Sequence, residues 1–297
     1  MLEEYALQLV KFALQEDLVG GGDVTTLNAL RSGVSARAVL VAKQPGVVAG
    51  LFVAKLAFAE VDAKVKFQPL TRDGDAVAAG VPLAKVSGSV GSLLTAERTA
   101  LNFLQRLCGI ATSSRRFVDA VKGTGAVILD TRKTTPGLRY LEKYAVKMGG
   151  AENHRLGLYD MYLVKDNHIR AAGGLTAAIE MIQRTRRDLL LEVEVESLDQ
   201  LTEALRPEVD RILVDNRPVE EVRRAVIEVD RWSAAHPDAS PRRRADARRW
   251  PEVEVSGGLS LETVRAFAET GVDYLSVGAI THSAPALDLS LEIEEIG

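Results

Sequence analysis

Six short apolar segments in the second half of the chain restrict the possible folds more than any other feature. They are AVILD, MYLVKD, LLLEVEVE, DRILVD, PEVEVSG and DYLSVGA, all between residues 126 and 279. Apolar residues at helical spacing separate them, at 138–148, 175–187, 198–205, 217–231 and 260–270. Strands that alternate with helices form a parallel sheet, because each helix returns the chain to the edge where the next strand starts. Six such units predict an α/β barrel that is either complete or open, since a complete barrel has eight.

The first third of the chain follows a different pattern. Residues 2–15 have helical periodicity, SARAVLVAKQPGVVAG contains two short strands around a turn, and KVKFQPL and PLAKVSGS add further strands. This order predicts a small α+β domain up to about residue 110. A long helix at 93–121, with a break near Gly109, is expected to follow it. The tail LDLSLEIEEIG alternates like a strand, and we expect it to return to the first domain.

Composition excludes several classes of protein. No apolar run approaches the roughly 18 residues that span a membrane, and the acidic, amphipathic N-terminus is not a secretory signal. A net charge of -4 argues against general binding of nucleic acid. The single cysteine, Cys108, cannot form an internal disulfide and fits a cytoplasmic protein. Its place in a helical run predicts a buried structural thiol.

Positive charge is concentrated between residues 130 and 170. This stretch contains eight lysine or arginine residues against five acids, although the whole chain is acidic. Several of these cations follow directly after the first two apolar strands. In an α/β barrel the reactive groups gather at the C-terminal ends of the strands, so the pattern predicts a site for a polyanionic small molecule. A second basic stretch at 233–249, rich in arginine and proline, is expected to be a solvated insertion.

Strand alternation predicts which polar side chains lie together at the strand ends. One face of the strands ends in Arg132, Lys165, Glu194, Asp215 and Ser256. Glu192, Glu194 and Glu196 share one face of a single strand, and they cannot all be buried without cationic partners. If this face points into the barrel, the expected counter-charges are Lys165, Arg132 and Lys133.

Two further patterns are typical of a sugar-phosphate site. The segments Ser256–Gly258 and Ser276–Ser283 are glycine-bearing turns between a strand and a helix, and the free N–H groups of such turns suit a phosphate. Glu194 and Asp215 offer a carboxylate pair for a divalent metal or for a ribose diol. The sequence contains no zinc-ligand spacing, dinucleotide fingerprint or P-loop.

At these residues the chain closely resembles the quinolinate phosphoribosyltransferase family. The matching stretches are EDLVGGGDVTT (16–26), LTAERTALNFLQRLCGIAT (94–112), DTRKTTPGLRYLEKYAVKMGGAENHRLGLYDMYLVKDNHI (130–169), EVEVES (192–197), LVDN (213–216), SGG (256–258) and SVGAITHS (276–283). The resemblance implies an N-terminal α+β sandwich domain, 1–112, which the tail 285–297 joins. It also implies a C-terminal open α/β barrel, 113–284, in which the insertion 233–249 is longer than expected for the family. The implied reaction joins quinolinate to phosphoribosyl pyrophosphate, giving nicotinate mononucleotide, pyrophosphate and carbon dioxide in NAD biosynthesis.

The resemblance also implies the roles of individual residues. Arg132, His154, Arg155 and Lys165 match the residues that hold the two carboxylates of quinolinate, and Lys133 matches a catalytic group near the reacting centre and the pyrophosphate. Glu194 and Asp215 match catalytic acids that contact the ribose hydroxyls and Mg²⁺, directly or through water. Ser256, Gly257, Gly258 and Gly278 match the loops that bind the 5′-phosphate. Arg98, on the long helix, matches an arginine that completes the site of the neighbouring subunit in a homodimer, and a higher oligomer stays open.

Three other interpretations remain open from the sequence. Lys165 in a barrel is also the residue type of a Schiff-base aldolase that acts on a phosphorylated sugar. The arginine-rich insertion 233–249 is the feature that a nucleic-acid-binding or other non-enzymatic protein would use. A related transferase acting on another pyridine is the third, although retention of both the Arg132–Lys133 pair and the His154–Arg155 pair favours a dicarboxylate acceptor.

Overall fold

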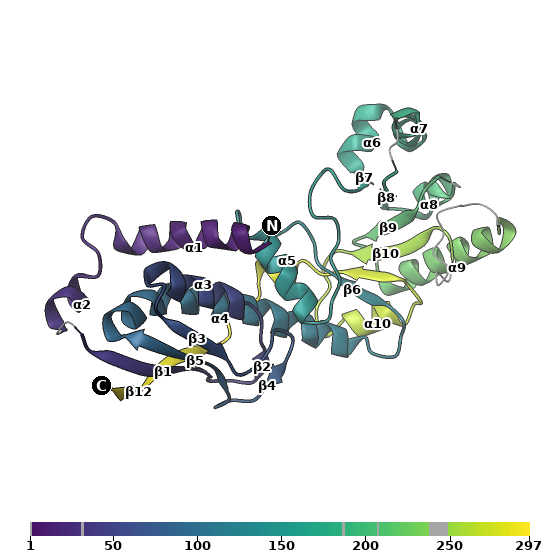
Figure 1. The fold of residues 1–297 in the computed structure, drawn as a ribbon. Coiled ribbons are helices and arrows are strands. Elements are labelled where there is room, and N and C mark those ends of the chain that lie inside the picture. The colour runs from purple at the N-terminus through teal and green to yellow at the C-terminus, as the bar shows by residue number, and fades with distance from the viewer. Residues whose placement is uncertain (1, 31–32, 186–187, 207, 238–248) are drawn as a thin grey trace. The chain divides into compact units, whose positions relative to one another are not determined.

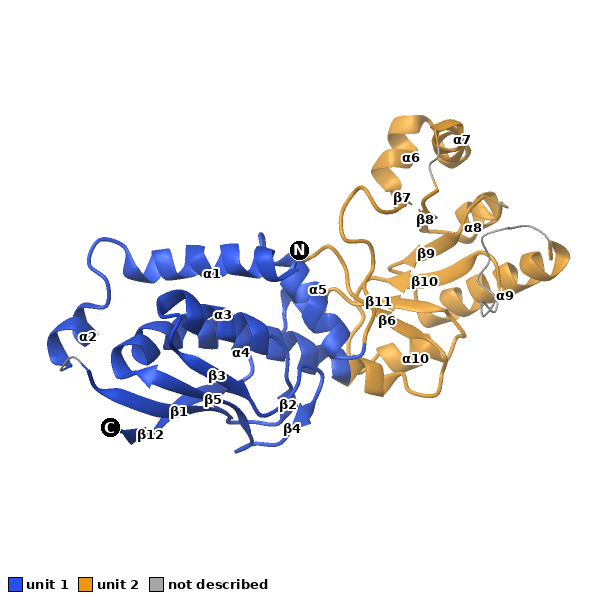
Figure 2. Ribbon diagram, viewed as in Figure 1, with its two compact units in different colours: residues 1–115, 134–150, 280–297 blue, residues 116–133, 151–279 orange. Residues whose placement is uncertain are grey.

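The computed structural model describes residues 2–30, 33–185, 188–206, 208–237 and 249–297. The chain forms two compact units, and neither is a single continuous stretch (Figure 2). Unit 1 comprises residues 1–115, 134–150 and 280–297, and unit 2 comprises 116–133 and 151–279. These units differ from the expected domains, 1–112 with 285–297 and 113–284, chiefly because residues 134–150 group with unit 1.

Unit 1 is built on a four-stranded antiparallel sheet in the order β12-β1-β5-β3. Its strands are β1 (Ser35–Ala42), β3 (Lys66–Pro69), β5 (Pro82–Ser89) and β12 (Leu289–Ile296). The alternating tail of the chain forms β12, and Leu291 pairs with Leu40 of β1. Two very short strands, β2 (Gly46–Val47) and β4 (Ala76–Val77), form a separate pair.

Helices cover one side of this sheet (Figure 1). They are α1 (Leu2–Leu18), α3 (Leu51–Val61) and α4 (Val90–Ala120), and unit 1 also holds α2 (Val24–Ala29) and α5 (Arg139–Met148). In α1 the buried residues Ala6, Val10 and Leu14 recur every four positions, so a single apolar stripe faces the core. Cys108 is completely buried in α4, as expected for a structural thiol, and burial raises the pKa of its thiol to about 12.

The expected break of α4 near Gly109 is wrong, because the helix continues through this residue. Gly109 instead allows another part of unit 1 to approach the helix closely. A Cβ at this position would lie 2.0 Å from the carbonyl oxygen of Pro285 and 3.1 Å from Cα of Ala286. The glycine is therefore required by backbone contact and not by a bend.

Unit 2 is built on six parallel strands in the order β6-β11-β10-β9-β8-β7. They are β6 (Val127–Leu129), β7 (Tyr162–Val164), β8 (Leu191–Val195), β9 (Arg211–Asp215), β10 (Glu252–Ser256) and β11 (Tyr274–Ser276). All six expected strands are present. Within unit 2, the first strand in sequence, β6, pairs with the last, β11. Strands β6 and β7 lie at the two ends of the order. The described strands thus form an open barrel, as the resemblance implied.

Helices follow the strands of unit 2 in turn (Figure 1). They are α6 (Asp166–Ala172), α7 (Leu175–Thr185), α8 (Leu198–Ala204), α9 (Val219–Ala235), α10 (Val264–Ala268) and α11 (Ala279–His282), the last at the boundary with unit 1. Contacts run from α7 to α8, from α8 to α9 and from α9 to α10, so these helices form a continuous outer layer.

Helix α6 was not expected from the sequence. Most of the insertion expected at 233–249 falls within 238–248, outside the described residues, and its character stays a prediction. In the part of the chain that the structure describes, every helix is too short or too polar to cross a bilayer.

We predict that Gly109→Ala lowers the free energy of unfolding by at least about 2 kcal/mol, because the new methyl group overpacks a backbone contact that has no room to adjust. Alanine is otherwise the better helix former, so helix propensity alone would change the stability in the opposite direction. Gly91→Ala in the same helix is the control, since its Cβ would meet a movable methyl group of Thr26 at 3.1 Å. Urea unfolding of both variants tests this, and equal stability of the two would contradict the interpretation.

Candidate active site

The parallel register of unit 2 aligns polar side chains in rows across one face of the sheet. Glu192 of β8 pairs with Arg211 of β9, which pairs with Glu252 of β10. One step further along the strands, Glu194 lies beside Leu213, Glu254 and Tyr274. At the C-terminal ends Asp215 lies beside Ser256, and Ser256 beside Ser276. Side chains of paired residues point to the same side of a sheet, so this face carries the polar groups that the sequence alternation predicted for β7 to β10.

For β6 the expected alternation is wrong. Val127 and Leu129 pair with Tyr274 and Ser276, so they share the polar face, whereas Ile128 belongs to the other side. The strand ends at Leu129, and Arg132 lies beyond it in the connection to α5. Arg132 therefore reaches its position through a loop and not through strand alternation.

Lys165 and Glu194 form an ion pair at the ends of β7 and β8. The Glu194 side chain is buried and that of Lys165 is 43% exposed. The backbone N–H of Lys165 donates to Nδ1 of His168 at 3.0 Å, at the start of α6, which fixes the main chain that carries the lysine. This pairing confirms Lys165 as a counter-charge for the acidic strand. Glu196 is exposed and needs no such partner.

A second ion-pair cluster lies deeper and was not expected. Nε2 of His154 lies 3.0 Å from Oε2 of Glu192 and 3.4 Å from Oε1 of Glu254. Both glutamates are completely buried. The other ring nitrogen, Nδ1, accepts the backbone N–H of Arg155 at 2.8 Å, and the N–H of His154 donates to Asp130 at 2.9 Å. Both nitrogens of this imidazole are therefore engaged within the protein.

Arg211 neutralises the same cluster from β9. It donates from Nη1 to Glu254 at 2.9 Å, and Nη2 lies 3.3 Å from Glu252. Its guanidinium carbon lies 3.8 Å from the centre of the Tyr274 ring, and the Tyr274 hydroxyl donates to Glu252 at 3.1 Å. Ser276 donates to Glu254 at 2.6 Å. Glu254 thus receives bonds from two neighbouring strands in addition to its contact with His154.

The pKa values of this cluster follow from competition between burial and charge. Burial alone lowers the pKa of His154, but hydrogen bonds to Glu192 and Glu254 outweigh it and raise the pKa to about 10. Burial and the negative charge of Glu254 raise the pKa of Glu192. Burial also opposes the charge of Glu254, but His154 and Arg211 lower its pKa to about 2. The cluster therefore favours the protonated form of His154 at neutral pH, and the pKa of Glu192 lies above its usual value.

The ligand atoms of His154, Glu192 and Glu254 all lie within 4.8 Å of one another, which is close enough for a metal site. Charge argues against that use. Arg211 already binds the second oxygen of Glu254, and a divalent cation there would face a buried guanidinium. Among the described residues this is the one group of His, Cys, Asp and Glu with metal-ligand spacing. Glu194 and Asp215, expected as the metal acids, lie on adjacent strands and project from the same face.

The loops above this cluster bring like charges together. Burial, and after it the neighbouring Arg132 guanidinium, lower the pKa of Arg155, so the positive charges of the two arginines lie near each other. Arg155 also donates from Nη1 to the carbonyl of Met161 at 3.3 Å. The carboxylate of Asp160 accepts the N–H groups of Leu156 and Gly157, at 2.7 and 3.0 Å, and so closes the loop that follows Arg155. Such a pair of guanidinium groups suits an anion with two carboxylates.

The ends of β9 and β10 are joined by an unusual backbone. Asn216 is the one non-glycine residue with positive φ among those described, at 52°, and its N–H donates to the carbonyl of Ser256 at 2.9 Å. Gly257 has φ of 96°, and a Cβ there would lie 3.0 Å from N and Cα of Asn216. At Gly258, φ is 63° and a Cβ would meet nothing within 4 Å. The two loops can interlock only because Gly257 lacks a side chain.

The remaining expected residues fall in both units. Lys133 is the last residue of the first segment of unit 2, and its backbone N–H donates to the Thr131 hydroxyl at 3.0 Å. Gly278 follows β11 in unit 2, at the second expected phosphate turn. Arg98 is an exposed residue of α4 in unit 1. The structure therefore brings together Lys165 with Glu194, Arg132 with Arg155, and Asp215 with Ser256 and Gly257.

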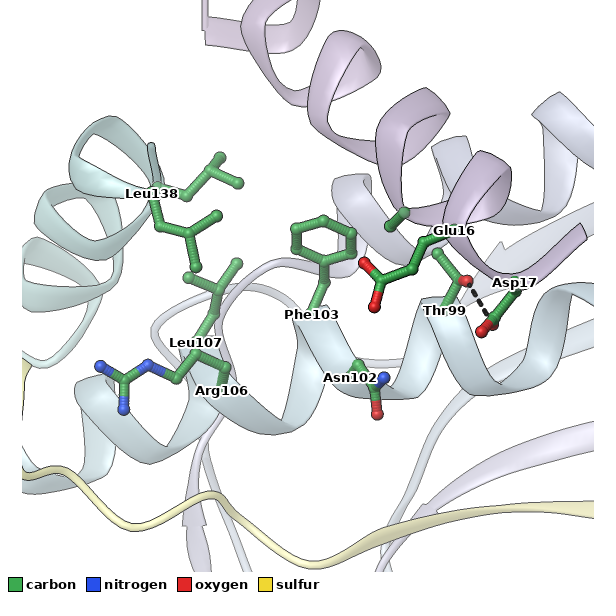
Figure 3. A pocket seen from close by; sticks show the side chains of 10 residues that line it. Glu16, Asp17, Thr99, Asn102, Phe103, Arg106, Leu107 and Leu138 are labelled. Atoms are coloured by element: carbon green, nitrogen blue, oxygen red, sulfur yellow. Dashed lines mark hydrogen bonds between the residues drawn. The ribbon is translucent and has the colours of Figure 1, made fainter. Parts of the chain in front are cut away.

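Unit 1 contains a separate hollow of about 190 Å³ beside α4 (Figure 3). Leu107 and Leu138 lie at one end, and Glu16 and Asp17 lie at the other. Arg106 also lines it, but its guanidinium binds Glu142 and the carbonyls of Thr281 and Ala284. A polyanion would meet two acids here and a cation that is already occupied, so this hollow does not suit such a ligand.

Glu192, Arg211 and Glu254 are the residues that sequence reasoning missed. The signal for Glu192 was present, because it shares the face of Glu194. Arg211 and Glu254 lie on the polar faces of their own strands, but only the residue at the end of each strand was predicted from the sequence as part of the site. The His154 contact joins residues 38 positions apart and left no local pattern to read.

Comparison with known proteins adds an independent line of evidence. Family models described as "Quinolinate phosphoribosyl transferase, N-terminal domain" and "Quinolinate phosphoribosyl transferase, C-terminal domain" match residues 23–108 and 110–292. The chain is 44% identical over 292 residues to a nicotinate-nucleotide pyrophosphorylase [carboxylating] from Mycobacterium leprae, covering 97% of each chain. It is 40% identical to quinolinate phosphoribosyltransferase [decarboxylating] 1b of Nicotiana tabacum, covering 96% of this chain and 81% of that one. Its fold matches the structure of the nicotinate-nucleotide pyrophosphorylase from Francisella tularensis with a TM-score of 0.87 and 36% identity, covering 98% of this chain and 97% of that one.

We predict that the stability of the protein falls as the pH rises from about 6.5 to 10, and that His154 is a main cause. Its folded pKa of about 10 exceeds the usual 6.5, so its contribution is fully present below pH 6.5 and is lost as the pH passes through 10. Glu192, whose pKa is also raised, acts with the same sign. Urea unfolding at pH 7 and pH 10 should show a loss that His154→Asn reduces by about 1 kcal/mol or more. Identical pH dependence in the two proteins would contradict the assignment.

Proposed function

The chain belongs to the quinolinate phosphoribosyltransferase family, and from that premise we propose how its residues carry out the reaction. Members convert quinolinate and phosphoribosyl pyrophosphate into nicotinate mononucleotide, pyrophosphate and carbon dioxide, and this chain is such an enzyme of NAD biosynthesis. The observation that supports the residue assignment is the proximity of the Arg132 and Arg155 guanidinium groups, beside the acidic strand ends of one sheet.

Quinolinate is held by the cations of the loops in unit 2. The two carboxylates of the acceptor relieve the repulsion between Arg132 and Arg155, and guanidinium forks bind carboxylates in a bidentate manner. Lys165, partly exposed beside Glu194, supplies a third positive charge. The family resemblance places His154 in the same set. Because both of its ring nitrogens contact the protein, we assign it the support of Arg155 in place of a direct grip on the substrate.

Phosphoribosyl pyrophosphate occupies the adjacent strand ends. The loops Ser256–Gly258 and Gly278 receive its 5′-phosphate through backbone N–H groups, which the positive φ of Gly257 and Gly258 turns outward from the ordinary strand geometry. Glu194 and Asp215 lie where the ribose hydroxyls are bound. As the bond to pyrophosphate weakens, positive charge develops on the ribose, and these carboxylates stabilise it. Lys133 stabilises the negative charge of the departing pyrophosphate.

Glu194 and Asp215 also fit a magnesium ion. They are hard oxygen donors on neighbouring parallel strands, and both project from the face that carries the other site residues. Glu194 is already paired with Lys165, so contact through water suits it better than direct ligation. Bound Mg²⁺ would supply positive charge to the pyrophosphate oxygens.

Decarboxylation follows ribosyl transfer in this proposal. Cations around the carboxylate of quinolinate oppose its loss as neutral carbon dioxide. After transfer the ring nitrogen is positively charged, and it stabilises the electron pair that remains at ring carbon 2 when carbon dioxide departs. A solvent proton then completes the product ring. Release of carbon dioxide from quinolinate in the absence of phosphoribosyl pyrophosphate would contradict this order.

The ion pair of Lys165 argues against the aldolase alternative. A Schiff-base lysine attacks as a neutral amine, and its pKa is lowered by burial or by another cation. Lys165 is instead partly exposed and is paired with the carboxylate of Glu194, so it has neither of these features. The assay that separates the two remaining transferase readings uses quinolinate and, in parallel, nicotinate with phosphoribosyl pyrophosphate and magnesium. Turnover of nicotinate but not of quinolinate would exclude quinolinate as the acceptor.

Arg98 is the reason to propose a homodimer. It is an exposed arginine on a helix of unit 1, and the resemblance places it in the site of the neighbouring subunit. Large apolar side chains are also exposed along α1 and α2 of unit 1: Phe12, Val19, Val24 and Leu27 are each more than 60% exposed. Exposed apolar groups gathered on neighbouring elements are typical of a subunit interface. The cytoplasmic location expected from the single cysteine stays a prediction.

We predict that Arg132→Ala and Lys165→Ala each lower kcat/KM for quinolinate at least about 100-fold, because each removes a charge-assisted contact with the acceptor. Arg132 is on a loop, so Arg132→Ala should change thermal unfolding little, whereas Lys165→Ala also leaves the buried Glu194 without its cation and should lower the melting temperature. Arg170→Ala is the control, since this exposed arginine belongs to the same basic stretch but to helix α6. Steady-state kinetics of the three variants provide the test, and near-normal turnover would remove the residue concerned from the site.

Mixing two inactive variants tests the shared site. Arg98→Ala lacks the residue given to the neighbour, and Lys165→Ala lacks a residue of its own barrel. In a mixed dimer one of the two sites has both residues, so co-refolding equal amounts should restore about a quarter of the wild-type activity. Failure of the mixture to exceed its separate components, with mixed dimers present by mass spectrometry, would place Arg98 outside the neighbouring site.

A further inference from the structure

Two buried glutamates of unit 2 have no part in the reaction as described so far. Glu192 and Glu254 are completely buried, on β8 and β10. Burying two carboxylates is costly unless cations and hydrogen-bond donors compensate them, and well-packed apolar residues would often be as stable. Their position directly beneath the basic loop therefore calls for an explanation other than stability.

The contacts of His154 connect these acids to the substrate-binding loop. Glu192 and Glu254 hold Nε2 of the imidazole, and Nδ1 holds the backbone N–H of Arg155. Asp130 fixes the backbone N–H of His154 itself. A continuous series of contacts thus leads from the centre of the sheet to the main chain of Arg155.

We propose that Glu192 and Glu254 are positioning residues of the quinolinate site, which act through His154 to fix the place of Arg155. The inference rests on the proposed function of that loop and adds to it the support that the guanidinium requires. Arg155 faces Arg132, and two like charges move apart unless their main chains are restrained. The acid pair supplies this restraint before the substrate arrives, so less of the binding energy is spent on ordering the loop.

The two acids have different parts in this arrangement. Glu254 is fixed by Arg211 at 2.9 Å and by Ser276 at 2.6 Å, so it forms a rigid base. Glu192 makes the shorter of the two contacts with His154. A change at Glu192 should therefore loosen the imidazole, whereas a change at Glu254 should also disturb the packing of three strands.

The test compares Glu192→Ala with Glu192→Gln. Alanine removes the carboxylate that contacts Nε2 of His154, and we expect the KM for quinolinate to rise about tenfold while the KM for phosphoribosyl pyrophosphate stays within about twofold. Glutamine keeps an acceptor oxygen of the same reach, so it should restore quinolinate KM to within about threefold of wild type. Glu252→Gln is the matched control, because this buried glutamate of β10 binds Arg211 and Tyr274. We expect it to change stability without changing the ratio of the two KM values.

A mutant cycle shows whether Glu192 acts through His154, and it uses the milder glutamine change in case the alanine variant does not fold. If Glu192 acts through His154, adding Glu192→Gln to His154→Ala should change quinolinate KM by less than about twofold. Independent, multiplying effects would overturn the proposal, as would an equal rise of both KM values in Glu192→Ala. Stoichiometric metal in the purified protein that disappears in Glu192→Gln would also overturn it. If wild-type protein fails to convert quinolinate, the proposed function itself is wrong, and that outcome is distinct from a variant without effect.

Discussion

Carboxylates on the inner face of the open barrel must be neutralised, and much of unit 2 follows from this requirement. Glu192 and Glu194 of β8 and Glu254 of β10 are buried, where water cannot solvate them. Each receives a cation from a different element: His154 from a loop, Lys165 from the position after β7 and Arg211 from β9. Because these partners are far apart in sequence, the ion pairs can form only when the strands adopt one order. Charge pairing and strand order therefore specify each other.

The same requirement separates the interior of the site from its entrance. Inside, acids and bases are paired, whereas at the loops burial and the nearby Arg132 lower the pKa of Arg155. In the proposed site a dicarboxylate binds both guanidinium groups, and an acceptor with one carboxylate would compensate less of their charge. On this proposal, selectivity for quinolinate over nicotinate comes from the positive charge of the loops.

Much of this could be predicted from the sequence, for physical reasons that differ between features. The six strands followed from apolar periodicity, which depends only on local spacing, whereas the open form of the barrel was implied only by the family resemblance. The pairing of Lys165 with Glu194 followed from the cost of burying acids. The partner of Glu192 did not, because three cations were available and only the tertiary fold selects His154. Likewise Gly109 was taken for a helix break, although its reason is a contact with Pro285 that lies 176 residues away in the chain.

The two halves of the proposed site would bind anions by different chemistry, and this difference determines how each tolerates change. In the proposal, the acceptor half uses side-chain charges, which a single substitution can remove without moving the backbone. The phosphate half uses main-chain geometry, in which Gly257 must leave room for Asn216 and both residues have positive φ. A side chain at Gly257 would displace the β9 loop and Asp215 with it, because Asn216 directly follows that acid. Damage to the phosphate loop should therefore reach the ribose site, whereas loss of a loop cation stays with the acceptor.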